Sequence, residues 1–198
     1  MKGLGRLFGF RAGPDTEQII KMGALELLQA YGLRGYVRPG DAETESRVWT
    51  YLAMRLAEGG VPDWIENMRP YLVSQGVDLE LLQNIGAPDG YRIILEGRRL
   101  LIYPYRNYVD WQTSIISSVQ ILNMLLERAG SAERGYILKG EEDDGLVLFM
   151  TPETHERIMA DPALLPEDHL YDVGTYDRPS REATKVFPAA KTEEIPTA

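Results

Sequence analysis

Cysteine is absent from this sequence of 198 residues, and histidine occurs only twice, as His155 and His169. Without cysteine the chain forms no disulfide bonds, thiolate zinc sites or iron–sulfur clusters, and it has no thiol nucleophile. Neither histidine belongs to an HExxH pattern, and no GxSxG motif, P-loop or strand-associated GxGxxG is present. We therefore predict no metal and no cofactor. An enzyme is the less favoured class, and one with catalytic residues dispersed along the chain stays an alternative.

Long apolar runs are also missing, since none approaches the roughly 18 residues of a membrane-spanning helix. The basic and apolar residues near the start are not followed by the apolar stretch of a secretory signal, so we expect a cytoplasmic protein. Residues 1–11 intersperse basic and apolar side chains. This pattern leaves open a peripheral contact with an anionic membrane.

Acidic residues outnumber basic ones, 30 to 21, which gives a formal net charge of −9. An acidic chain disfavours non-specific binding to nucleic acids, because that binding depends on lysine and arginine displacing counterions. The four consecutive acidic residues 141–144 lack the alternating spacing of a calcium-binding loop and predict a solvated turn.

Changes in composition and periodicity divide the chain into four regions. We expect a basic, amphipathic or flexible segment over residues 1–14, a helical region over 15–86, an α+β region over 87–162, and an acidic, proline-containing tail over 163–198. Apolar stripes in the second region predict helices over residues 15–31, 41–58, from Pro62 onward and 78–85. Pro70 must break or restart the third helix, because proline has no N–H to donate.

The period then changes to the alternation of strands. The pattern predicts strands over 91–95 and 99–103, a long helix over 108–129, strands over 136–139 and 146–150, and a helix that begins after Thr151. We expect this hairpin–helix–hairpin–helix unit to form one antiparallel sheet packed by helices, in an α+β fold. Six apolar residues should lie buried in that sheet: Ile93, Leu95, Leu100, Ile102, Val147 and Phe149.

The order helix, two strands, long helix, two strands, helix resembles that of type III secretion chaperones over about a third of the chain, without a third strand in the first set. The resemblance implies a small acidic protein that forms dimers. It is a likeness of element order, which bears on the fold more than on the function.

Two turns are possible in the first hairpin. A type II′ turn at Gly97-Arg98 places Glu96 opposite Arg99, whereas a turn at Glu96-Gly97 places Leu95 opposite Arg98. We favour the first turn, because it brings opposite charges together across the strands.

Arginines and aromatic residues gather between residues 91 and 111. The candidate binding residues are Arg92, Arg98, Arg99, Tyr103, Tyr105, Arg106, Tyr108 and Trp111. Arginine offers a planar fork to phosphate or carboxylate groups, and tyrosine offers rigid contact area to a protein. With strand alternation, Arg92, Arg99 and Tyr103 should share the face opposite Ile93 and Ile102. The alternative is a sheet face half covered by the N-terminal helices.

These observations favour a non-enzymatic interaction protein, such as an adaptor, a chaperone-like factor or a subunit of a larger assembly. Its partner would be another protein or a second copy of the chain. The alternative is a protein that binds a nucleic acid or another anion through the arginine- and tyrosine-rich hairpin, although no known RNA-binding motif is present.

Overall fold

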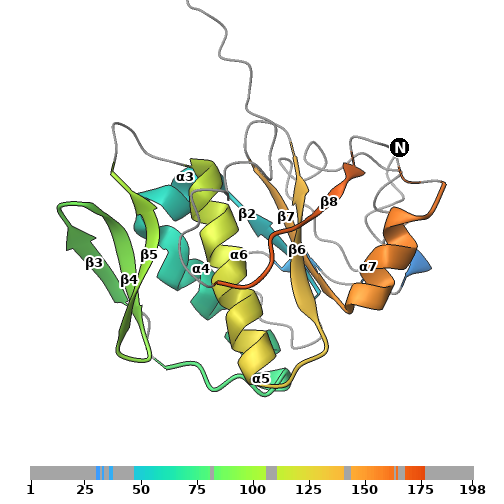
Figure 1. The fold of residues 1–198 in the computed structure, drawn as a ribbon, viewed down its shortest axis with the longest axis horizontal. Helices are drawn as coiled ribbons and strands as arrows, with labels where there is room; N and C mark the ends of the chain where they lie inside the picture. Colours follow the sequence, from blue (N-terminus) through green and yellow to red (C-terminus); the bar gives the residue numbers. More distant parts are fainter. Residues whose placement is uncertain are drawn as a thin grey trace, which may run out of the picture.

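A computed structural model of the chain describes residues 30–31, 33, 36–37, 47–80, 83–105, 111–140, 144–162, 164 and 168–176. These residues form helices and two mainly antiparallel sheets, which confirms the α+β class. Figure 1 shows helix α6 between the two sheets, and α6 contacts strands of both. The predicted segment 1–14 lies outside the described residues.

The larger sheet has five strands in the order β1-β2-β7-β6-β8. Its strands are β1 (Tyr36–Val37), β2 (Val48–Tyr51), β6 (Arg134–Lys139), β7 (Gly145–Met150) and β8 (Leu170–Asp172). β1 and β2 are parallel, and all other pairs are antiparallel. Every residue of β7 is buried. Both faces of this sheet are therefore covered.

The smaller sheet has three antiparallel strands in the order β3-β4-β5. They are β3 (Gln83–Ala87), β4 (Gly90–Leu95) and β5 (Arg98–Pro104). Tyr91, Ile93 and Leu95 alternate with more exposed residues along β4. One face of this sheet therefore packs on the core and the other faces outward.

Six helical segments complete the described fold. They are α3 (Ala53–Arg55), η2 (Leu56–Gly60), which is kinked at Glu58 and Gly59, α4 (Val61–Asn67), α5 (Arg69–Ser74), α6 (Trp111–Arg128) and α7 (Pro152–Met159). Pro70 restarts the helix as α5, as predicted. Thr151 caps α7 by accepting a hydrogen bond from the Thr154 N–H at 3.2 Å, with Pro152 at the start.

Helix α6 is buried along most of its length, and its polar side chains bind backbone groups at the ends of strands. The Asn123 carboxamide accepts from the Gly135 N–H at 2.6 Å and donates to the carbonyls of Gly135 and Gly174, at 3.2 and 2.9 Å. β8 ends at Asp172, opposite Tyr136, so it does not pair with Gly135. Asn123 thus satisfies the groups that a longer β8 would have bound.

Two hydrophobic clusters lie on opposite faces of the five-stranded sheet. The larger joins Trp49, Val147 and Phe149 of this sheet to α6, the N-terminal helices and the three-stranded sheet. The smaller joins Tyr136 and Leu148, with other strand residues, to Ile158 of α7.

The prediction that both hairpins lie in one sheet is wrong. All six predicted core residues are buried, but four lie in the three-stranded sheet and two in the five-stranded sheet. The two sheets stay apart because α6 packs between them, against β5 of one sheet and β6 of the other.

Three predicted segments also differ from the structure. The helix expected over residues 41–58 is strand β2 in its described part before α3, since its buried residues pair with β7. The helix expected over 78–85 is wrong in its described part, since residues 78–80 are not helical and β3 begins at Gln83, where it adds a third strand beside the first hairpin. The region 163–198, expected to be a tail, contains β8, which pairs with β6.

The first hairpin turns at Glu96-Gly97, so the favoured turn at Gly97-Arg98 is wrong. Leu95 pairs with Arg98, and Glu96 and Gly97 have φ values of 51° and 70°. Two positive φ values define a type I′ turn, whose twist matches that of the strands. Glu96 also forms an ion pair with Arg128 of α6, and this contact holds the turn against the helix.

We expect Gly97→Ala to lower the free energy of unfolding by about 1 kcal/mol, because no atom crowds the added Cβ and the cost is that of a left-handed backbone. Gly97→Asn should cost less, since asparagine tolerates this conformation. Urea denaturation of both variants checks the result. An asparagine variant that is less stable than the alanine variant would indicate the type II′ turn instead.

Among the described residues, no helix has both the length and the apolar character needed to cross a membrane.

Candidate functional site

The structure separates the predicted binding residues into two groups. Arg98 and Arg99 are exposed beside the hairpin turn, whereas Tyr103 and Tyr105 lie at the other end of β5. Tyr103 lies four positions beyond Arg99 along the strand, which corresponds to about 13 Å. The arginines and tyrosines therefore do not form one surface.

The remaining candidates are dispersed. Arg92 is half-buried and forms an ion pair with Asp89, and this ion pair holds the pKa of the Asp89 carboxyl below its usual value. Trp111 is the first residue of α6 and is exposed. Arg106 and Tyr108 lie outside the described residues.

A β-bulge changes the direction of Tyr103. Tyr91 pairs with Tyr103 but Arg92 pairs with Leu101, so Ile102 is an extra residue on β5. The bulge turns Tyr103 to the core side of the sheet, where it is 2% exposed. The predicted face that joins Tyr103 to Arg92 and Arg99 is therefore wrong. The carbonyl of Ile102 accepts a hydrogen bond from the Ser117 hydroxyl of α6 at 2.8 Å.

Tyr103 instead lines an open cavity of about 470 Å³ between the three-stranded sheet and η2. We call this cavity the tyrosine pocket. Its lining residues are Ala57, Glu58, Gly59, Asn84, Ile85, Tyr91, Tyr103 and Tyr105. Its volume is in the range of pockets that bind small molecules or a partner's side chain.

Three tyrosine rings form one wall of the tyrosine pocket. The ring centroids of Tyr91 and Tyr103 are 5.7 Å apart, as are those of Tyr103 and Tyr105, and both pairs have an interplanar angle of 67°. This edge-to-face arrangement is favourable for aromatic pairs. Tyr105 is 50% exposed and is the ring most accessible to a ligand.

Hydrogen bonds hold the opposite wall in place. The Tyr103 hydroxyl donates to the Ala57 carbonyl at 2.7 Å, and the Tyr91 hydroxyl donates to Asn84 Oδ1 at 2.8 Å. Asn84 in turn donates from Nδ2 to the Gly59 carbonyl at 2.7 Å. Gly59 has a φ of 106°, which interrupts the helical backbone at this point. Each wall thus fixes the other, as a preformed binding site requires.

Tyr91 of the pocket stays neutral at physiological pH. Burial raises the pKa of Tyr91 above its ordinary value, and the nearby Asp63 carboxylate raises it further.

The sequence identified Tyr103 and Tyr105 but missed Asn84, Ile85 and the η2 residues of the pocket. A signal for β3 was present, because Pro88-Asp89-Gly90 is a strong turn sequence directly before β4. The pairing of Ala87 with Gly90 confirms that turn. No local pattern reveals that η2 packs against this hairpin.

Other exposed apolar side chains belong to elements at the same end of the molecule as Tyr105. Leu52 and Met54, beside and within α3, are 41% and 51% exposed, and Trp111 is 41% exposed. Figure 1 shows α3, the end of β5 and the beginning of α6 at the same end of the molecule. We call Leu52, Met54, Tyr105 and Trp111 the apolar rim.

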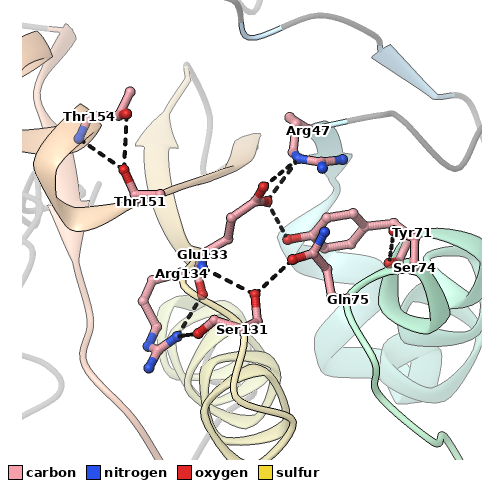
Figure 2. Close-up of polar contacts among 9 residues, drawn as sticks. All are labelled: Arg47, Tyr71, Ser74, Gln75, Ser131, Glu133, Arg134, Thr151 and Thr154. Carbon is pink, nitrogen blue, oxygen red and sulfur yellow. Dashed lines mark hydrogen bonds and ion pairs between the residues drawn. The ribbon is translucent and has the colours of Figure 1, made fainter.

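A cluster of polar side chains lies after the C-terminal end of α6, where the chain enters β6 (Figure 2). Arg47 Nε lies 2.8 Å from a Glu133 carboxylate oxygen, and the Tyr71 hydroxyl donates to Glu133 at 2.9 Å. The Arg47 guanidinium lies over the Tyr71 ring, 4.9 Å from its centroid. Ser131 extends the cluster by donating to Gln75 at 2.7 Å. These contacts join α5 to the starts of β2 and β6, and they hold the fold together.

The described residues contain no group of three or more histidine, aspartate or glutamate side chains placed to hold a metal ion. His155 stacks on Tyr136 with 4.0 Å between the ring centroids, and its Nε2 lies 3.2 Å from the Leu170 carbonyl. This histidine thus joins α7 to the five-stranded sheet.

Comparisons of the chain with protein-family models, curated proteins and solved structures gave no match. The function is therefore argued from the pocket, its rim and the charge of the chain.

Proposed function

We propose that this chain is a non-enzymatic protein-interaction protein, an adaptor or assembly subunit, that binds a partner protein through the tyrosine pocket and the apolar rim. The observation that supports it most is the position of the exposed apolar side chains. Leu52, Met54, Tyr105 and Trp111 belong to elements that meet at one end of the molecule. A group of exposed apolar residues is typical of an interaction site.

The residue types support the same proposal. Tyrosine, tryptophan and methionine are enriched in protein interfaces, because they bury a large area at a small cost in conformational entropy. The walls of the pocket are already held by hydrogen bonds. A partner therefore meets a preformed surface, which lowers the entropic cost of binding.

Nucleic-acid binding is the second candidate, and one observation favours it. Arg98 and Arg99 are exposed, and neither forms an ion pair with another described residue. Single-strand binding combines cationic groups with aromatic rings on which bases stack. Here the rings lie about 13 Å along the strand from the arginines. That separation and the net charge of −9 make a protein partner the better proposal.

Affinity purification of the tagged full chain, followed by quantitative mass spectrometry, tests this proposal. We expect Tyr105→Ala to reduce recovery of a specific partner at least about tenfold, because anchor aromatics commonly contribute more than 1.4 kcal/mol. Val73→Ser is the matched control. Val73 is an exposed apolar residue of α5, away from the apolar rim.

Two results would contradict the proposal. One is a partner whose recovery is equal in the wild type and the Tyr105→Ala variant. The other is a nucleic acid whose binding is lost in an Arg98→Ala/Arg99→Ala variant and weakens steeply with salt.

Light scattering at several concentrations shows whether the partner is a second copy of the chain. The proposal keeps the cytoplasm as the compartment, and cell fractionation tests that part.

A further inference from the structure

The hydrogen-bonding groups of the tyrosine pocket favour a ligand that donates. The protons of the Tyr91 and Tyr103 hydroxyls are already given to Asn84 and Ala57. Neither hydroxyl therefore has a proton left to donate to an anionic ligand. A ligand with several N–H donors therefore matches this pocket better than a carboxylate or a phosphate.

The charged side chain among the described lining residues of the pocket is acidic. The Glu58 side chain lines the pocket, is exposed, and forms no ion pair with any other described residue. Asp63 of α4 acts on Tyr91 from outside the pocket lining. None of the described lining residues is a lysine or an arginine. The pocket is therefore a favourable place for a positive charge and an unfavourable place for an anion.

Aromatic rings add a second attraction for a cation. A guanidinium or ammonium group near a tyrosine ring gains from the negative face of the ring, and the gain increases when water is excluded. Tyr105 is the exposed ring of the pocket, and Tyr91 and Tyr103 lie behind it at steep angles. Arginine is also the charged residue most enriched at interface anchors.

We propose that the tyrosine pocket receives an arginine or lysine side chain of the partner protein, with Glu58 as its counter-charge and Tyr105 as its aromatic contact. This inference rests on the proposed function, because it names the group by which the partner is recognised. The negative charge of the whole chain, −9, attracts such a basic segment over a longer range.

An NMR titration of the full-length chain with two small probes tests the inference. The probes are Nα-acetyl-arginine amide and Nα-acetyl-citrulline amide, which have nearly the same shape and differ in charge. We expect the arginine probe to shift the resonances of Glu58, Gly59 and Tyr105 saturably, with a dissociation constant on the order of millimolar. The citrulline probe should bind at least about tenfold more weakly, because it lacks the charge.

Variants connect this binding to the two proposed contacts. Tyr105→Ala should weaken binding of the arginine probe about fivefold or more, and Glu58→Gln should weaken it about threefold. Glu153→Gln is the matched control, since Glu153 is an exposed carboxylate on α7, far from the pocket. This control variant should bind the arginine probe as the wild type does.

The outcomes separate this inference from the proposed function. Equal binding of both probes, or arginine binding that is unchanged in Tyr105→Ala and Glu58→Gln, would overturn the cationic ligand. If the partner still depends on Tyr105, the interaction function stands without it. If the arginine probe binds in the pocket but no partner depends on Tyr105, the proposed function fails instead.

Discussion

Replacement of Asn123 by leucine is expected to lower the free energy of unfolding by roughly 3–6 kcal/mol. The Asn123 side chain makes hydrogen bonds to three backbone groups: the N–H and carbonyl of Gly135 and the carbonyl of Gly174. Leucine has a similar size but no polar atoms, so these groups would lose their partners inside the protein. Each unsatisfied buried group costs about 1–3 kcal/mol.

Urea denaturation followed by circular dichroism measures this loss. Met124→Leu is the matched control, because Met124 is the next residue of α6, is half-buried, and conserves volume when it becomes leucine. The control should cost less than about 1.5 kcal/mol. A cost below about 1 kcal/mol for Asn123→Leu would mean that water reaches Gly135 and that α6 does not seal this edge of the sheet.

Replacement of Ile102 by alanine is expected to lower the free energy of unfolding by roughly 2–5 kcal/mol, as for other well-packed isoleucines. Ile102 is fully buried in the larger hydrophobic cluster and is the extra residue of the bulge. The truncated side chain would leave a cavity between β5 and α6. The bulge limits how far the backbone can move to fill it.

Leu101→Ala serves as the control for position on the same strand. Leu101 is only half-buried, so its truncation should cost less than half as much as that of Ile102. Denaturation with two probes, tryptophan fluorescence and circular dichroism, compares the variants under two-state conditions. Equal losses at the two positions would contradict the facing assigned to β5.

Much of the fold could be predicted because its signals are local. Short runs of apolar residues marked β4, β5, β6 and β7, and Thr151 with Pro152 marked the start of α7. Alternation marks a strand with one buried face, such as β4, and a short apolar run between turn residues marks a buried strand such as β7. They fail for β2, where Val48, Trp49 and Tyr51 are all buried and the spacing also fits a helix.

The candidate site was only partly predictable for a different reason. Composition drew attention to Tyr103 and Tyr105, but strand alternation placed Tyr103 on the wrong face. A single extra residue in a strand reverses the facing of every residue beyond it. Nothing local marks the bulge, because the partner that stabilises it is Ser117 on α6.

The sequence by itself determined that the chain has an α+β fold, a net negative charge and no thiol chemistry, because these properties depend on composition and on short-range periodicity. Only the tertiary structure decided that the hairpins belong to two sheets, that the arginines and tyrosines lie apart, and that a pocket forms. Those features depend on contacts between distant segments, such as Tyr103 with Ala57 and Asn123 with Gly174. Packing against α6 and η2 selects among the registers and facings that local preferences leave nearly equal in energy.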